Sequence, residues 1–263
     1  MPAGFAHYRF GTQILPQLPA DARKVLLRHR AIFDIGVQGP DFLFFHSFFK
    51  KTHLYRLGNQ YHEISGREFF TQMCAHTAAQ PTEENQAYLA GLLSHYCLDS
   101  GCHPFVYAAT EDTATGHSEL ETEFDRYLMT LDGIKKPHET NISRHLRLKK
   151  KDYATVAGFF PEITPKDAQS CIRSMALSQK LLTLPTAAGH KAVELFTGFA
   201  GGNTGGKVMT VGPHPRWAKL NGKMLEHYEQ SRKRFPVLLA QLNRHIAKGE
   251  PFGSDFDANF DRG

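Results

Sequence analysis

One short stretch of the chain holds five side chains of the types that bind metal ions: His95, Asp99, His103, His117 and Glu121. Side chains four residues apart on a helix project from the same face. His95 and Asp99 could therefore bind one cation together, and His117 and Glu121 could bind another. A single histidine on an apolar face is more typical of a core residue, but five ligands in this spacing predict a metal site. Mixed imidazole and carboxylate ligands favour zinc or a similar transition ion over calcium, which prefers oxygen alone.

Two helices are expected to position these ligands. Thr82 is a typical N-cap with acidic residues directly after it, and apolar residues follow at helical spacing. We expect this first helix to end near His103, because Pro104 follows it. We expect Thr115 to cap the second helix, whose apolar, inward positions are Leu120, Phe124, Tyr127 and Leu128. An inward carboxylate needs a partner, so the pattern indicates at least two neighbouring ions.

The remainder of the chain also has the apolar spacing of helices, and no convincing set of alternating strands or internal repeats is visible. The predicted fold class is therefore all-α. Further helices are expected over residues 21–35, 66–79, 165–182, 186–196 and 215–247.

The length of 263 residues and a hydrophobic content of 41% allow a sizeable core. We predict one multi-helix domain over residues 1–263, with the metal ligands in about 1–135 and a helical scaffold in about 136–263.

The charge is mildly basic, at a net +5. Five of the basic residues lie in one segment: Arg144, Arg147, Lys149, Lys150 and Lys151. We favour a solvated loop face for this segment over a patch that binds anionic lipid or nucleic acid. No apolar run reaches the ~18 residues of a membrane helix. The N-terminus lacks the features of a secretory signal, so a cytoplasmic location is expected unless the sequence is trimmed. The four cysteines form no zinc-knuckle pattern and are expected to be buried thiols.

Two further patterns have simple interpretations. Gly201–Lys207 fits half of a phosphate-binding loop, but Val208 replaces the required Ser or Thr, so we reject that function. An aromatic run could line a substrate pocket, although core packing is favoured for most of its members: Phe42, Phe44, Phe45, Phe48 and Phe49.

Four segments together carry a family resemblance. They are GPD at 39–41, LGNQYHE at 57–63, AYLAGLLSHYCLDSGCHP at 87–104 and HSELE at 117–121. Over the first half of the chain, their order and spacing resemble the zinc-dependent phospholipase C family, which shares a helical fold with P1-type nucleases. The gap between Asp99 and His103 is shorter than in the secreted members.

The resemblance implies the ligands of each ion. One zinc would be held by Asp41, His62, His95 and Asp99, and a second by His103, His117 and Glu121. Asp99 would also bridge to a third ion, completed by His7 and by the amino and carbonyl groups of the terminal residue. The secreted enzymes have a tryptophan there, whereas this chain begins Met1-Pro2. The resemblance therefore implies two zinc ions; a third depends on whether the terminal residue of this chain, which is Pro2 after removal of the methionine, supplies the same ligands. His46 and His53 are alternatives to His62, which we prefer for its LGNQYHE context.

The predicted function is metal-dependent hydrolysis of a phosphodiester by a metal-activated water, as in phospholipase C. Asp41 is the candidate catalytic residue that orients or deprotonates the water; the alternative is a turn-forming aspartate after Gly39 and Pro40. The expected substrate is a phospholipid, met at a membrane surface, or a soluble phosphoester. Two alternatives remain: a P1-like nuclease or phosphomonoesterase, and a zinc-stabilised helical binding protein without catalysis.

Overall fold

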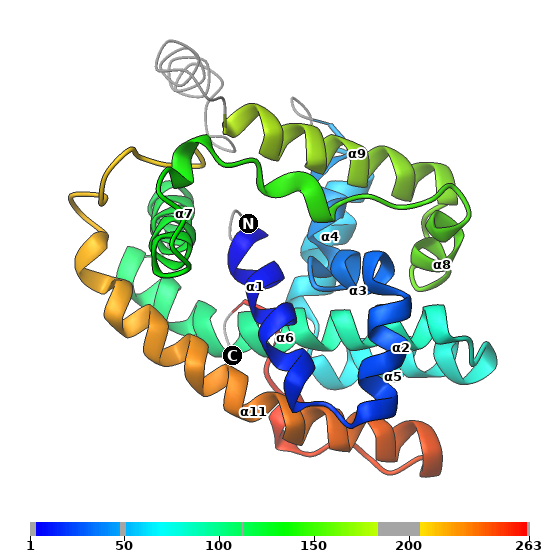
Figure 1. The fold of residues 1–263 in the computed structure, drawn as a ribbon. Coiled ribbons are helices and arrows are strands. Elements are labelled where there is room, and N and C mark those ends of the chain that lie inside the picture. Colours follow the sequence, from blue (N-terminus) through cyan, green and yellow to red (C-terminus); the bar gives the residue numbers. More distant parts are fainter. Residues whose placement is uncertain (1–3, 48–50, 112, 184–205, 262–263) are drawn as a thin grey trace.

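A long central helix organises the molecule in the computed structural model, which describes residues 4–47, 51–111, 113–183 and 206–261. This helix, α6 (Glu83–Thr110), passes through the middle of the fold, with α1 (Gly4–Ile14), α3 (Arg30–Gly36) and α11 (Asn221–Lys248) packed along it (Figure 1). It is buried on nearly all sides, as expected for a helix whose apolar residues are not confined to one stripe.

The other helices surround this axis. They are α2 (Ala20–Arg28), α4 (His53–Glu63), α5 (Gly66–Ala79), α7 (Ala114–Leu131), α8 (Asp152–Gly158) and α9 (Pro165–Leu182). Short 3-10 turns join them: η1 (Leu15–Gln17), η2 (Gly39–Phe45), η3 (Pro137–Glu139), η4 (Ile142–His145), η5 (Ala218–Leu220) and η6 (Ser254–Phe256). The described residues contain no strand, so the all-α prediction is confirmed.

Side-chain caps explain where several helices begin. The Thr82 side chain accepts a hydrogen bond from the Asn85 N–H at the start of α6, as predicted. A reciprocal capping box between Thr164 and Asp167 starts α9, with Pro165 at its first position. The predicted helices over 66–79 and 165–182 have the observed bounds.

Other predicted helix bounds were wrong. The first ligand helix does not end near His103: α6 continues through Pro104 to Thr110. Proline removes one backbone hydrogen bond, but packing against α11 holds the helix together there. A Cβ added to Gly101 would lie 2.1 Å from Ser231 Oγ, which shows how closely the two helices approach.

Two more helix boundaries differ from the predicted ones because of local contacts. The predicted helix over 21–35 breaks at His29, which together with Arg28 contacts Glu83. α7 begins at Ala114 rather than after Thr115, because Thr113 O already accepts from the His117 N–H.

The helix expected from Pro215 begins only at Asn221. The chain before it forms a turn and η5, in which Trp217 is buried and donates to Glu119. The helix predicted over 186–196 lies outside the described residues.

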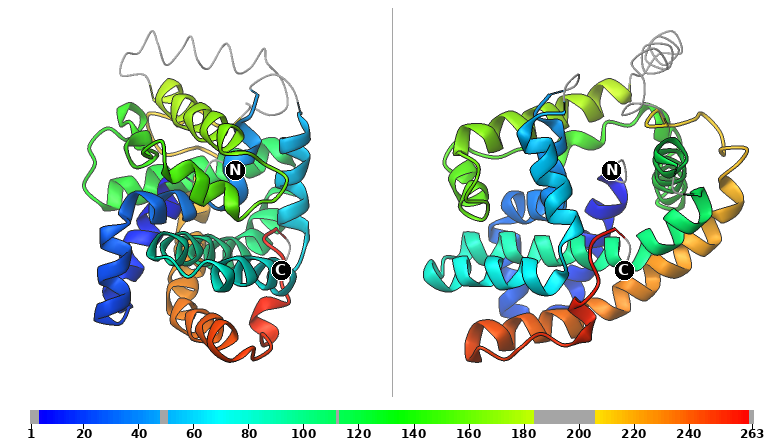
Figure 2. Two further views of the ribbon diagram at one scale, coloured as in Figure 1. Left: turned by 90° about the vertical axis from the view of Figure 1, so that its right-hand side faces the viewer. Right: turned by 180° about the vertical axis from the view of Figure 1, so that it is seen from behind.

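The C-terminal tail returns to the middle of the fold. Both views in Figure 2 place its red trace beside α6. Phe252, Phe256 and Phe260 of the tail are buried, and the Phe260 N–H donates to the carbonyl of His62 in α4. The apolar core therefore includes side chains from α1 at one end of the chain to the tail at the other.

Surface and thiol predictions can also be compared with the structure. The side chains of Arg144, Arg147 and Lys149–Lys151 are exposed, in agreement with a solvated face, and all four cysteines are buried and free. None of the described helices is both long and apolar enough to span a membrane.

Candidate metal centre

The structure brings all eight predicted ligands into three adjoining clusters. We name them the deep cluster (Asp41, His62, His95), the central cluster (His7, His95, Asp99) and the rim cluster (His103, His117, Glu121). Within each cluster, one ligand atom from every residue lies within 4.8 Å of the others. Three such clusters side by side are a geometry that could hold several metal ions.

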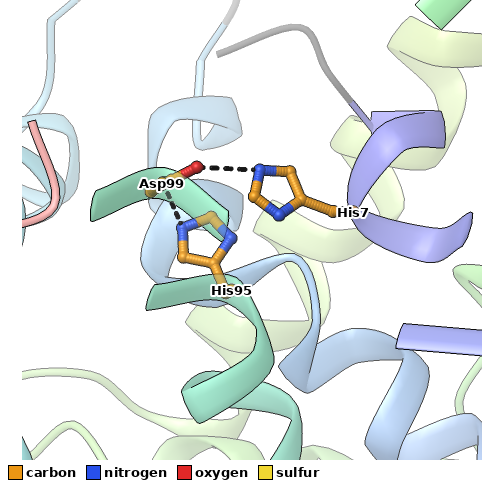
Figure 3. A group of neighbouring side chains, drawn as sticks. All are labelled: His7, His95 and Asp99. Atoms are coloured by element: carbon orange, nitrogen blue, oxygen red, sulfur yellow. Dashed lines mark ion pairs between the residues drawn. The ribbon is translucent and has the colours of Figure 1, made fainter. Parts of the chain in front are cut away.

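The central cluster joins α1 to α6. His7 projects from α1 toward Asp99 on α6, and His95 lies one turn before Asp99 on the same helix (Figure 3). The two Asp99 oxygens face different rings: Oδ1 lies 3.0 Å from His7 Nε2, and Oδ2 lies 2.9 Å from His95 Nε2. Asp99 Oδ1 is also 3.8 Å from His103 Nε2 of the rim cluster. Asp99 therefore stands between the clusters, where a shared ligand would be needed.

The deep cluster depends on the glycine of the GPD segment. Gly39 has a φ of 57°, a left-handed conformation that favours glycine. A Cβ at this position would lie 2.1 Å from Cδ2 of His95. The chain can therefore pass directly over the His95 ring and bring Asp41, in η2, to 2.8 Å from His62 Nε2.

Backbone carbonyls orient two of the imidazoles. His62 Nδ1 lies 2.7 Å from the Gly58 carbonyl, and His103 Nδ1 lies 2.8 Å from the Phe260 carbonyl. A carbonyl can only accept, so in each ring Nδ1 carries the hydrogen and Nε2 faces its cluster. Metal-binding histidines are commonly held in this way.

Several polar atoms in the clusters are buried but make no hydrogen bond. They are His7 Nδ1, Asp41 Oδ1, Glu121 Oε2 and both ring nitrogens of His95. The contact between His95 Nε2 and Asp99 is short, yet it lacks the alignment of a hydrogen bond. An unpaired buried polar atom is costly. His95 Nε2 and Asp41 Oδ1 face other ligand atoms of their clusters, so a zinc ion bound there would give them a partner, and the N and O donor sets suit that ion.

Charge in the metal-free centre is balanced between carboxylates and imidazoles. Burial would raise the pKa of Asp99, but His95, His103 and His7 outweigh it and hold that pKa well below its usual range. Burial would also raise the pKa of Glu121, yet His117 and His103 hold it well below normal. Both carboxylates are therefore ionised and ready to act as ligands.

Two imidazoles of the centre show the opposite shift. Burial lowers the pKa of His62, but the Asp41 carboxylate outweighs it and raises that pKa to about 8. Burial likewise opposes protonation of His103, yet Asp99 and Asp261 keep its pKa well above normal. A metal ion must displace these protons, because only neutral imidazole binds metal.

His46 and His53, the alternatives to His62 as a ligand, lie outside the three clusters. Their rings meet edge to face with their centroids 6.1 Å apart. The aromatic run meets the site at one point, since Phe44 packs against His62 while Phe42 packs in the core against Phe160. Phe48 and Phe49 lie outside the described residues.

Two neighbours of the centre were missed by the sequence analysis. Phe260 packs against His62 and His95, and Asp261 Oδ1 lies 3.6 Å from His103 Nδ1. The tail contains many polar residues, but its phenylalanines recur every fourth residue at 252, 256 and 260, a spacing that could have indicated a packed segment.

Comparison with known proteins gives one match. The family model described as zinc dependent phospholipase C matches residues 6–165, more than half of the chain, and this range contains every residue of the three clusters. No curated protein and no solved structure matches the chain at a significant level. On the family match, the chain belongs to the zinc-dependent phospholipase C family.

Proposed function

We propose that this protein is a zinc-dependent phosphoric ester hydrolase of phospholipase C type that cleaves a phospholipid or a related phosphodiester. The observation that carries the proposal is the junction of three clusters at His95 and Asp99, with buried donor atoms that have no hydrogen-bond partner. Closely spaced divalent ions suit phosphoester hydrolysis. The family match supports the same chemistry.

Each cluster offers three protein side chains, although His95 is common to two of them. Structural zinc sites usually have four protein ligands, whereas catalytic sites keep a position for water or substrate. We assign one ion to the deep cluster and a second to the rim cluster, with Asp99 shared between ions. When bound, zinc would polarise a water molecule and neutralise charge on the phosphoryl oxygens.

Asp41 is our candidate for positioning the attacking water. Its Oδ2 lies 3.8 Å from His95 Nε2, and its Oδ1 has no aligned hydrogen bond. A carboxylate in this position can hold a water and accept its proton. Phe44 and Phe260 pack against His62, the partner of Asp41 in the deep cluster, and Asp41 itself is almost fully buried.

The direct test compares metal-stripped and zinc-reloaded protein on a panel of substrates. The panel contains a phosphatidylcholine micelle, a soluble phosphodiester, a phosphomonoester and single-stranded nucleic acid. We expect zinc-dependent release of a phosphorylated head group or cleavage of the soluble diester. Preferred cleavage of nucleic acid or the monoester would favour the P1-like function instead. A zinc-loaded protein that hydrolyses none of the four would contradict the proposal and favour a zinc-stabilised binding protein.

A further inference from the structure

A lysine outside the family match lies beside the metal centre. Lys207 is the last residue of Gly201–Lys207, the segment whose resemblance to a phosphate-binding loop was rejected. Of this segment the structure describes Gly206 and Lys207. The family match ends at residue 165, so neither residue is part of it.

The backbone before Lys207 is attached to the ligand helix α7. Thr122 Oγ1 donates a hydrogen bond of 2.9 Å to the Gly206 carbonyl. Gly206 has a φ of 78°, and a Cβ there would lie 2.8 Å from the Thr115 carbonyl oxygen and 2.9 Å from the Glu119 nitrogen. Only glycine permits this approach. Lys207 directly follows this contact. It therefore starts from a point on the surface of α7 next to Thr122, whose neighbour in the sequence is the rim ligand Glu121.

Two carboxylates act electrostatically on the Lys207 ammonium, and they belong to different clusters. One is Glu121 of the rim cluster and the other is Asp41 of the deep cluster. Burial is the larger influence and lowers the pKa of this lysine, while both carboxylates oppose that change. The ammonium is therefore near enough to both clusters to interact with a carboxylate of each, and Lys207 is partly shielded from water.

The ammonium has no direct partner in the part of the chain that the structure describes, since no carboxylate there lies within 4.0 Å of it. Its two distant carboxylates are metal ligands in our assignment. When Glu121 and Asp41 bind zinc, their negative charge is neutralised by the metal ions. The positive charge of Lys207 would then lie near positive ions with no negative group to balance it. A partly buried cation beside dications needs an anion between them, and an ammonium is a common partner of phosphate oxygens.

We propose that Lys207 binds a non-bridging oxygen of the substrate phosphoryl group and so forms, with the rim and deep clusters, one anion-binding site. This inference rests on the proposed function for the identity of the anion. It assigns Lys207 to substrate binding and not to metal binding. The site would therefore take inorganic phosphate as well as a phosphoester.

Inorganic phosphate is the probe that tests this site without turnover. Calorimetric titration of the zinc-loaded protein measures its affinity in the wild type, Lys207→Met and Lys207→Arg. Lys223→Met is the matched control, because Lys223 is exposed and pairs with Glu226 away from the clusters. Zinc content is measured on every sample. We expect Lys207→Met to weaken phosphate binding by about 10-fold or more, the usual effect of losing a charged hydrogen bond, with unchanged zinc.

The arginine variant should retain most of the affinity, because it keeps the charge, and the control should match the wild type. Equal phosphate affinity in the wild type and Lys207→Met would overturn the inference. So would loss of zinc in Lys207→Met, since it would assign the lysine a structural role. If phosphate binding depends on Lys207 but no ester is cleaved, the proposed function fails while the anion site stands.

Discussion

The deep and rim clusters are built in different ways. The deep cluster takes Asp41, His62 and His95 from η2, α4 and α6, and these side chains are almost fully buried. The rim cluster takes its residues from α6 and α7 alone, and its His117 side chain is 12% exposed. The tail contacts both clusters, since Phe260 packs against His62 and its carbonyl accepts from His103, whereas the loop before Lys207 is attached to α7 beside Glu121.

In our account, the deep cluster and the rim cluster have different tasks. A buried cluster assembled from distant elements fixes the fold around an ion and shields it from bulk solvent. A cluster near the surface, bordered by residues that lie outside the family match, is where substrate enters and where specificity is set. Asp99 couples the two, because its oxygens face the central cluster and lie near the rim.

The largest loss of zinc and activity is expected from Asp99→Asn, because Asp99 lies near ligands of both the deep cluster and the rim cluster. The variant should lose zinc from the centre and most of the stabilisation that zinc gives, about 3 kcal/mol when zinc is present at 100 times its Kd. Turnover should fall by more than the ~10–100-fold typical of changes around a metal ligand. Metal analysis and thermal unfolding with and without zinc measure this. A variant with normal zinc and activity would remove Asp99 from the shared position.

Glu121→Gln should distinguish the contribution of the rim cluster from that of the deep cluster. It removes a rim ligand but leaves the deep cluster complete, so turnover should be abolished while the fold and part of the zinc remain. Circular dichroism, metal analysis and a turnover assay report these three properties. Glu119→Gln is the control, because Glu119 lies on the same helix and bonds Trp217 outside the clusters. Full activity in Glu121→Gln would remove the rim ion from the mechanism.

The pH dependence of stability should reverse when zinc binds. The folded-state pKa of His62 is raised from 6.5 to about 8. Its protonation therefore stabilises the metal-free fold fully below pH 6.5, and this contribution, about 2 kcal/mol, is lost as the pH rises through 8. Zinc requires the neutral ring, so zinc affinity should increase over the same interval. Unfolding in denaturant across this pH range, with and without zinc, tests both trends; parallel trends would contradict zinc binding by His62.

The smallest effect is expected from Asp261→Asn in the tail. Asp261 lies near His103 Nδ1, the nitrogen that faces away from the rim cluster, where a carboxylate can orient the ring. Its loss should therefore weaken rim zinc by about 10-fold, as for other changes to groups that orient a ligand. Competition with a chelator measures this affinity. Asp257→Asn in the same tail is the matched control, because Asp257 pairs with Arg67 at the surface. Equal zinc affinity in both variants would show that the tail does not tune the rim cluster.

Much of the site could be predicted because its signals are local. The four-residue spacing of His95 with Asp99 and of His117 with Glu121 placed each pair on one helix face, and the structure has these pairs 2.9 Å and 3.1 Å apart. His62 was preferred over its rivals from its sequence context, and it alone among them lies in a cluster.

The remaining features depend on tertiary packing, which leaves weaker signals in the sequence. Pro104 indicated a helix end, but contacts with α11 carry α6 past it. The contact of Asp261 with His103 and the position of Lys207 arise from segments far away in the sequence. The clusters do not test which ligands share an ion: Asp99 lies with His7 and His95 in the central cluster, and the other three ligands implied for the first zinc form the deep cluster.

The central claim is that the deep and rim clusters each hold a zinc ion and that Asp99 lies between them. Anomalous diffraction at the zinc absorption edge, from crystals of the zinc-loaded protein, tests it directly. We expect separate peaks among the Asp41, His62 and His95 ligand atoms and among those of His103, His117 and Glu121. Zinc-loaded crystals without a peak in either cluster would contradict the account.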